Sequence, residues 1–245
     1  MGNLGNFLSV LSHGIVYTVA ATAGGIVLST IMAFVAGLTG RSRSRTVRII
    51  TRIYVEGFRG TSELVQLFWI YFAVPLLIHF QLVPLAAGII VLGLNFGAYN
   101  SEIVRGAVQS VPREQWEGGT ALNFTPAQRM RRVILPQALA EMIPPFTNQF
   151  VLLLQASALV SLITVPDITY QGVTILEPSY TTQVLPIFLL MLVLYLLLAI
   201  VIVLAMRLAE RWANGVSGRP PRVSRRAPLM RDIVPTGLPG IGGGH

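Results

Sequence analysis

Long stretches without a charged side chain dominate this sequence of 245 residues. No Asp, Glu, Lys or Arg occurs in residues 1–40, 64–101 or 142–166. About 20 consecutive apolar residues are enough for a helix to cross the hydrocarbon core of a bilayer. Charged residues make up only 11% of the chain, whereas a soluble domain typically has about 25%. The sequence is therefore typical of an integral membrane protein and argues against a soluble enzyme.

Length and hydropathy predict an all-α, polytopic domain over residues 1–213 with five transmembrane helices. The spans are expected at residues 15–38, 62–78, 84–103, 142–166 and 184–206. Residues 46–58 are expected to form an interfacial or inward-leaning helix that leads into the next span, and Pro144 and Pro145 to lie in the first turn of the fourth span. The first span lacks a preceding basic segment and is predicted to be retained, unlike a signal peptide. Residues 214–245, rich in Arg, Pro and Gly, are predicted to be a disordered tail.

The basic residues predict the orientation of the chain. All 18 are arginines, and they fall between alternate spans and in the tail. Cytoplasmic loops of membrane proteins carry such an excess of positive charge. We therefore expect a multi-pass protein of the cytoplasmic (inner) membrane, with its N-terminus outside and its C-terminus in the cytoplasm. The alternation with apolar spans also excludes a nucleic-acid-binding protein.

One polar hairpin interrupts the apolar chain at residues 109–138, which read QSVPREQWEGGTALNFTPAQRMRRVILPQA. Its first half, residues 114–122, is predicted to be a short helix. A second helix is expected to begin at Pro126, with Thr125 as N-cap and Gln128 completing a capping box. It is expected to end before Pro136, because proline disfavours the α conformation of the residue preceding it. A pair of short helices that projects from the membrane is a candidate docking element for a soluble partner.

The sequence offers no chemistry of its own. It has no Cys and only three His, and it lacks Walker, H-E-x-x-H and G-x-S-x-G motifs. We therefore predict no catalytic residue, no metal and no cofactor. These absences argue against a membrane-embedded enzyme, and an ion-coupled secondary transporter stays open as one alternative.

The hairpin resembles the EAA loop of the integral membrane permeases of ABC importers. Glu117, Gly118 and Gly119 stand at the E-A-A triplet, and Ile134-Leu135-Pro136 complete its end. The segments FRGTSELVQLFWIYFAVP, NFGAYNSEIVRGAVQSVP and MIPPFTNQFVLLLQASALVSLITVPDIT resemble the polar amino acid branch. That branch carries histidine, glutamate, glutamine, arginine and opines, and the hairpin is also similar to ectoine and hydroxyectoine permeases. The resemblance covers residues 12–210.

The resemblance implies a type I ABC importer permease fold that lines the translocation path of a polar amino acid or related compatible solute. Its partners would be a cytoplasmic ABC ATPase dimer, an extracytoplasmic solute-binding protein and a second permease copy or paralogue. The permease itself would hydrolyse no ATP. The residues implied in coupling to the ATPase are Glu117, Gly118, Gly119, Asn123, Thr125, Pro126, Arg129 and Pro136. Asn123 stands where the family usually has Gly, and a turn with positive φ is expected there.

Four polar residues within the spans are candidates for the substrate path, namely Glu63, Gln66, Asn95 and Gln155. Polar groups in hydrocarbon are costly and are therefore candidates for function. The alternative is that they hold helices together by hydrogen bonds, as Asn and Gln often do. Another small polar solute also stays open, because Glu63 and Gln155 depart from the family pattern.

Overall fold

The structure is a computed structural model that describes residues 2–42, 44–79 and 81–217 of the chain. Every regular element within those ranges is helical. The predicted tail lies outside the described residues from position 218 onward, and residues 214–217 belong to the last helix. The elements are α1 (Gly2–Thr39), α2 (Arg45–Arg59), α3 (Glu63–Phe68), the π-helix η1 (Trp69–Ala73), α4 (Val74–Ile78), α5 (Pro84–Gln109), α6 (Arg113–Ala121), α7 (Pro126–Arg129), the π-helix η2 (Met130–Ile134), α8 (Leu135–Ala156), the 3₁₀-helix η3 (Ser157–Ile163), α9 (Ile168–Tyr170), the π-helix η4 (Gln171–Leu176), α10 (Glu177–Ser179), the 3₁₀-helix η5 (Thr181–Gln183) and α11 (Val184–Ser217).

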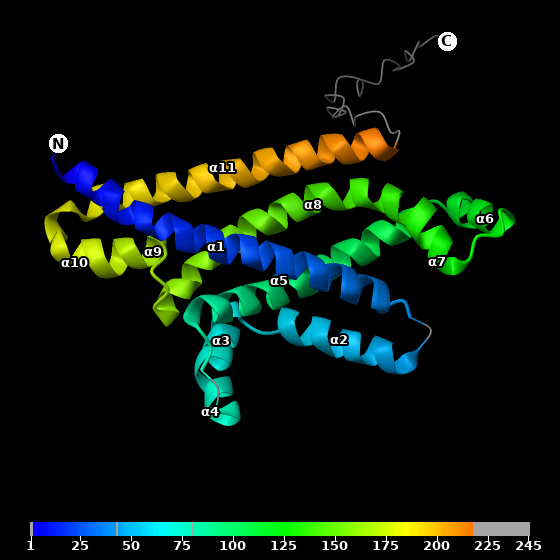
Figure 1. Ribbon diagram of the computed structural model, residues 1–245, viewed down its shortest axis with the longest axis horizontal. Coiled ribbons are helices and arrows are strands. Elements are labelled where there is room, and N and C mark those ends of the chain that lie inside the picture. The colour runs from blue at the N-terminus through cyan, green and yellow to red at the C-terminus, as the bar shows by residue number, and fades with distance from the viewer. Residues whose placement is uncertain (1, 43, 80, 218–245) are drawn as a thin grey trace, which may run out of the picture.

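The long helices α1, α5, α8 and α11 run side by side along the molecule, with the hairpin of α6 and α7 at one end and the N-terminus at the other (Figure 1). Four helical stretches of the described chain are long and apolar enough to cross a membrane: Leu4–Thr39, Pro84–Gln109, Pro126–Ile163 and Thr181–Ala213. The predicted all-α membrane fold is thus confirmed. The helices extend past the ranges expected from hydropathy, since an α-helix continues beyond the edge of the hydrocarbon layer.

The second span has a form that the sequence did not predict. Two helical segments, residues 45–59 and 63–78, meet at an angle of 107°. Together they are long and apolar enough to form one broken span. In Figure 1, α2 lies along α1 and α5, whereas α3 and α4 project sideways from the bundle. The helix expected over residues 46–58, at the interface or leaning inward, therefore packs lengthwise against the bundle.

Two expectations about proline were wrong. The helix that begins at Pro126 does not end before Pro136 but continues through η2 into α8, and it reaches Ile163. The π-helical turn makes this possible, because the N–H of Leu135 bonds the carbonyl of Met130, five residues back, and the ladder widens just before the residue that has no N–H. Pro144 and Pro145 lie in the interior of α8, because that helix begins well before residue 142.

Small residues allow α1 and α5 to pack closely. A Cβ on Gly93 would stand 2.5 Å from the Leu28 side chain, and one on Gly37 would stand 2.7 Å from the carbonyl of Ser101. Both glycines therefore serve close helix–helix approach, which in membranes depends on small residues. Three buried apolar clusters follow the bundle. One lies at the hairpin end around Val104, one in the middle, and one at the opposite end around Ile187.

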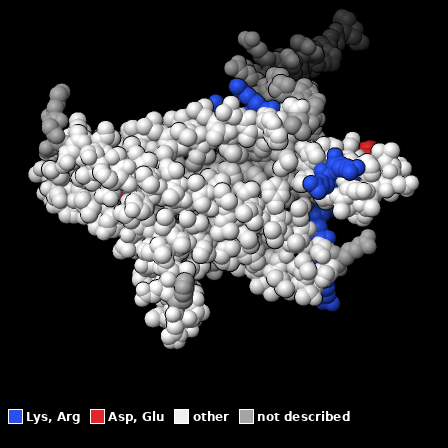
Figure 2. Space-filling model, viewed as in Figure 1, with Lys and Arg blue, Asp and Glu red and all other residues white. Residues whose placement is uncertain are grey.

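The surface divides into a charged end and an apolar body. In Figure 2 the arginines visible on this face gather around the hairpin end, and the remainder is almost uncharged. α11 exposes large aliphatic side chains along its length, among them Leu185, Leu196 and Val201. A helix of this kind is suited to face lipid.

Candidate functional site

The tip of the hairpin has the local structure expected from its sequence. Thr125 Oγ1 accepts from the N–H of Gln128 at 3.3 Å, and the side-chain oxygen of Gln128 accepts from the N–H of Thr125 at 3.0 Å. The capping box is therefore present, with Pro126 at the start of α7. Asn123 has φ of 55°, so the left-handed turn predicted at this position is confirmed. These features fix the angle between α6 and α7.

Arg129 folds back against the inside of the hairpin. Its guanidinium donates to the carbonyl of Trp116 at 3.4 Å and to the hydroxyl of Thr120, and it lies 5.5 Å from the centre of the Trp116 ring. The stem of Arg129 covers Gly119, where an added Cβ would come within 2.9 Å of Arg129 Cγ and Cδ. Gly119 therefore provides the space in which Arg129 folds back.

Other hairpin residues remain available to a partner. Glu117, Gly118, Asn123, Thr125 and Pro126 are exposed. Leu122, which the sequence did not single out, is 69% exposed at the tip. A hollow of about 520 Å³ lies beside α7 and is lined by Ala127, Gln128, Arg131 and Arg132. Pro136 is half-buried at the start of α8 and so lies behind the exposed tip.

Two of the four path candidates hold the sharp corner between α2 and α3. Gln66 donates to the carbonyls of Phe58 and Thr61 at 2.9 and 3.2 Å, and its side-chain oxygen accepts from Asn95 at 3.0 Å. Asn95 also donates to the carbonyl of Phe58 at 3.2 Å. Both side chains are buried. These contacts satisfy backbone carbonyls that the broken helix leaves without partners, so Gln66 and Asn95 join helices.

The other two candidates are placed differently. Glu63 begins α3 and is half-buried. Gln155 lies on α8 with its side chain exposed, on the same face as exposed Asn148 seven residues earlier. The Gln155 side chain makes no hydrogen bond to any residue that the structure describes. It therefore does not join helices within one chain, and it faces whatever lies beside α8.

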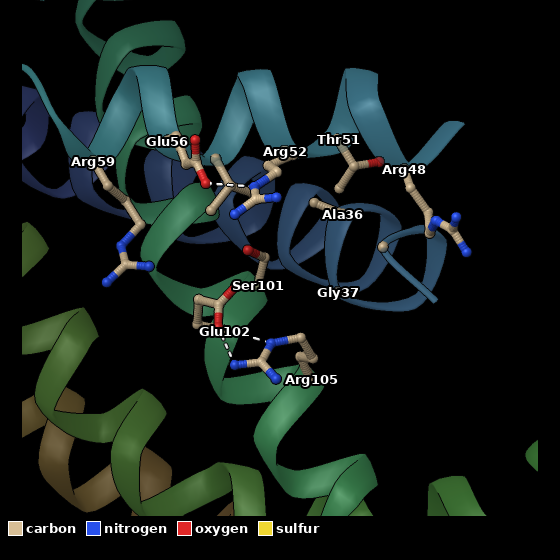
Figure 3. Close-up of a pocket in the computed structure, with 12 residues that line it drawn as sticks. Ala36, Gly37, Arg48, Thr51, Arg52, Glu56, Arg59, Ser101, Glu102 and Arg105 are labelled. Carbon is tan, nitrogen blue, oxygen red and sulfur yellow. Dashed lines mark hydrogen bonds and ion pairs between the residues drawn. The ribbon is translucent and has the colours of Figure 1, made fainter. Parts of the chain in front are cut away.

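A charged groove that the sequence did not predict lies where α2 crosses α1 and α5. It encloses about 420 Å³. Its lining comes from the end of α1 (Ala36, Gly37, Gly40), from α2 (Arg48, Thr51, Arg52, Val55, Glu56, Arg59) and from α5 (Ser101, Glu102, Arg105). Figure 3 shows the charged side chains of α2 along one side of this space and those of α5 along the other.

Hydrogen bonds fix α2 over the groove. The Tyr54 hydroxyl donates to the carbonyl of Leu94 at 2.7 Å, and the hydroxyls of Thr39 and Thr51 lie 3.1 Å apart. On the deeper side, the Tyr99 hydroxyl donates to the carbonyl of Arg59 at 3.3 Å, and the Arg59 guanidinium lies 5.3 Å from the centre of the Tyr99 ring. The groove is thus a built feature of the packed helices.

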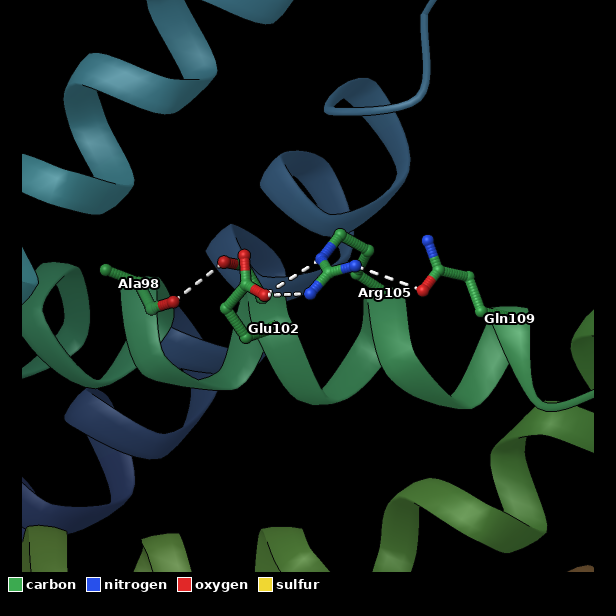
Figure 4. A network of polar contacts seen from close by, with 5 residues as sticks. Ala98, Glu102, Arg105 and Gln109 are labelled. Carbon is green, nitrogen blue, oxygen red and sulfur yellow. Dashed lines mark hydrogen bonds and ion pairs between the residues drawn. The ribbon is translucent and has the colours of Figure 1, made fainter.

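The charges of the groove are only partly paired. Arg52 bonds Glu56 at 2.6 Å. On α5, Arg105 Nε bonds Glu102 at 2.8 Å and its Nη1 bonds Gln109 at 3.0 Å, which forms the row of contacts in Figure 4. Arg48 and Arg59 have no carboxylate partner among the described residues. Four arginines and two glutamates therefore leave a net positive groove that presents charges of both signs.

A sequence signal for this groove did exist. Arg48, Arg52, Glu56 and Arg59 recur at intervals of three or four residues, the spacing of one helix face. The periodicity predicts a charged face on the helix expected over residues 46–58, but it does not indicate which helix that face lies against.

A buried carboxylate lies at the opposite end of the bundle. Asp167 caps α9 by accepting from the N–H of Tyr170 at 2.8 Å, and the Tyr195 hydroxyl donates to it at 3.4 Å. An added Cβ on Gly14 of α1 would stand 2.6 Å from the backbone of Asp167. Burial raises the pKa of Asp167 to about 6. Asp167 thus joins the loop after η3 to α1 and α11.

A bundle of long apolar helices, a capped hairpin at its charged end and a charged groove beside α2 are consistent with an integral membrane transport component. The sequence of residues 25–215 matches the family described as binding-protein-dependent transport system inner membrane component. The chain belongs to this family. It is therefore a multi-pass inner-membrane subunit that works with a substrate-binding protein and a separate ATPase. The family favours an ATP-driven importer over the ion-coupled alternative.

Known proteins resemble the chain over most of its length. It is 38% identical over 216 residues to the probable amino-acid ABC transporter permease protein y4tF of Sinorhizobium fredii. The matched residues cover 84% of this chain and 90% of that protein. It is 39% identical over 163 residues to the L-cystine transport system permease protein TcyB of Bacillus subtilis, covering 66% and 69%. The crystal structure of an amino acid ABC transporter with histidines superposes with a TM-score of 0.76 at 28% identity, covering 86% of this chain and 97% of that one.

Proposed function

We propose that this chain is the permease subunit of an ATP-driven importer of a polar amino acid, and that the groove between α2 and α5 is part of the solute path. The single observation that supports this most directly is the placement of Arg48, Arg52, Arg59, Glu102 and Arg105 around one groove between α2 and α5. The amino acid class is supported by the names of the similar permeases. Ectoine and hydroxyectoine stay sequence predictions.

Depth is the first argument for a path. α2 has 15 residues and lies beside α1 and α5, so Arg59 stands about 20 Å further along the bundle than Arg45. The hydrocarbon core of a bilayer is only about 30 Å thick. A charged side chain at that depth is very costly in lipid and persists where it faces water or a partner charge. The groove therefore suits a water-filled path.

The mixture of charges is the second argument. An amino acid carries a carboxylate and an ammonium group. A guanidinium binds a carboxylate with two parallel hydrogen bonds, and a glutamate accepts from an ammonium. Arg59, which has no carboxylate partner within the described ranges, can bind the solute carboxylate. Glu102, already bonded by Arg105, has a second oxygen with which to accept from the ammonium group.

The proposal includes an orientation and an assembly. The arginines visible in Figure 2 gather at the hairpin end, and the positive-inside rule supports a cytoplasmic position for that end, with the N-terminus outside. A second permease, identical or paralogous, would complete the path. Gln155 and Asn148 on the exposed face of α8 would lie on that path or on the contact with the second subunit, because polar side chains do not favour lipid. Glu63 lies at the corner where the path would widen.

The hairpin would dock in the ATPase dimer through its exposed residues. Glu117, Gly118 and Asn123 would contact the ATPase surface, with Leu122 as an apolar anchor at the tip. Arg131 and Arg132 would add positive charge beside them. Thr125, Pro126 and Arg129 would act indirectly by holding the shape of the hairpin, and Pro136 by starting the helix behind it.

Uptake by the purified complex tests the role of the groove. The permease, its ATPase and its binding protein are reconstituted in proteoliposomes, and uptake of radiolabelled amino acids, cystine among them, is measured with ATP. Arg59→Gln removes a groove charge but keeps a polar side chain. We expect it to lower uptake at least about tenfold, because hydrogen bonds to charged groups contribute about 1.5–3 kcal/mol.

Arg45→Gln is the matched control, because Arg45 is exposed on the same helix and does not line the groove. It should transport as the unchanged protein does. Equal uptake by Arg59→Gln and Arg45→Gln would remove the groove from the solute path. ATP-dependent uptake of uncharged sugars in place of amino acids would refute the solute class.

A further inference from the structure

An aromatic ring connects the hairpin to the first helix of the bundle. Trp116 of α6 holds two guanidinium groups over its ring, that of Arg129 at 5.5 Å and that of Arg41 at 5.6 Å from the ring centre. Arg129 belongs to the hairpin itself, whereas Arg41 follows directly after α1. The stack is therefore a side-chain contact between the hairpin and the turn that joins α1 to α2.

Each partner in the stack is held in place. Arg129 is fixed by its bonds to Trp116 and Thr120 and by its packing on Gly119. Trp116 packs against the buried apolar cluster at the hairpin end. The backbone N–H of Arg41 bonds the carbonyl of Leu38 at 3.2 Å, so Arg41 continues the winding of α1. The stack therefore links the hairpin to the end of α1.

The end of α1 is also the mouth of the charged groove. Ala36, Gly37 and Gly40 line that groove, and Gly40 directly precedes Arg41. The Thr39 hydroxyl contacts the Thr51 hydroxyl of α2 at 3.1 Å. A shift of Arg41 would thus move both α1 and α2 at the place where the groove opens.

We propose that Arg41 and Trp116 are positioning residues for coupling, which transmit the motion of the ATPase-bound hairpin to the mouth of the groove. This inference rests on the proposed function. This coupling role is distinct from docking of the ATPase, because Arg41 lies outside the hairpin. It is also distinct from solute binding, because Arg41 does not line the groove. A cation over a Trp ring at an exposed site is attracted enough to shift an equilibrium about two- to fivefold.

The test uses the complete complex of permease, ATPase and binding protein in proteoliposomes. Two quantities are measured on each variant: co-purification of the ATPase, and the amount of amino acid imported per ATP hydrolysed in the presence of loaded binding protein. Arg41→Ala should keep the ATPase bound and lower the import per ATP about two- to fivefold. Arg41→Lys, which keeps a cation over the ring, should recover part of the loss. Arg45→Ala, a nearby exposed arginine without ring contact, is the matched control.

A double-mutant comparison separates the stack from simple damage to the hairpin. If Arg41 acts through the ring, Arg41→Ala should change little in a Trp116→Leu background. Import per ATP at the unchanged level in Arg41→Ala, or equal losses from Arg41→Ala and Arg45→Ala, would overturn the inference. Both results would leave the groove proposal intact, since that proposal is judged by Arg59→Gln and by the solute imported by the unchanged complex.

Discussion

Gly119 and Gly118 are neighbours on α6 with opposite surroundings, and the same substitution should have opposite effects on them. A Cβ on Gly118 meets nothing within 4 Å, whereas a Cβ on Gly119 would come within 2.9 Å of Arg129 Cγ and Cδ. Alanine at either position favours the helix by about 1 kcal/mol relative to glycine. At Gly119 the same methyl group would push Arg129 away from Trp116 and Thr120.

The contacts of Arg129 set the size of the effect. A cation over a tryptophan ring contributes about 0.5–1 kcal/mol, and hydrogen bonds from a charged donor contribute about 1.5–3 kcal/mol. After subtraction of the gain in helix propensity, Gly119→Ala should destabilise the folded hairpin by about 1–3 kcal/mol. Gly118→Ala should stabilise it by up to about 1 kcal/mol.

Hydrogen exchange of the amides of residues 113–121 in nanodiscs measures this stability directly. Exchange should become faster in Gly119→Ala and slower in Gly118→Ala, and only the former should weaken binding of the ATPase. In an Arg129→Ala background the obstruction is absent, so adding Gly119→Ala should slow exchange. Faster exchange in that background as well, or similar exchange in Gly119→Ala and Gly118→Ala, would refute the packing explanation.

Three further predictions concern other parts of the chain. Burial raises the pKa of Asp167 to about 6 from 3.8. Between about pH 4 and pH 6 the folded state therefore binds a proton that the unfolded state has released. The stability of the folded state consequently falls as pH rises through this window. Asp167→Asn should lose that pH dependence, which melting temperatures at pH 4.5 and 7 would show by comparison with the unchanged protein. Gln155→Leu should lower uptake in proteoliposomes without changing assembly of the complex, and unchanged uptake kinetics would exclude Gln155 from the path. Asn123→Ala should destabilise the hairpin by about 1–2 kcal/mol because of its positive φ, whereas Asn123→Gly should be neutral; exchange rates of the hairpin amides would distinguish them.

Local features were predictable because local chemistry determines them. The capping box at Thr125 depends on residues three positions apart, and the left-handed turn at Asn123 needs one tolerant residue. The spans follow from long uncharged runs for the same reason. Hydropathy does not predict which side chains meet when helices pack against one another. It therefore could not show that Arg129 turns inward or that Gln66 binds Asn95 at the corner.

The groove depends on contacts between helices that are far apart in the sequence. Arg59 and Glu102 line one groove because α2 packs against α5. No pattern within either segment reports that packing. The Arg and Glu periodicity of α2 could have indicated a charged face, but the α5 side of the cavity follows only from the packing of the bundle. The charged face of α2 was therefore predictable from the sequence, whereas the position of that face opposite α5 was not.

The proline that was expected to end a helix instead lies within the stiff connection behind the hairpin. The chain from Pro126 to Ile163 is helical over 38 residues, so a movement of α7 passes directly to the part of α8 that exposes Gln155. The π-helical turn at η2 is where this connection is most easily weakened. Arg132 is exposed at this turn. Arg132→Gly and Arg132→Ala both remove the charged side chain, but only glycine also destabilises the helical backbone, by about 1 kcal/mol. We expect both variants to bind the ATPase equally and Arg132→Gly to import less amino acid per ATP. Equal import by the two variants would show that stiffness of this helix does not carry the motion, and would leave the Arg41–Trp116 contact as the route from the hairpin to the groove.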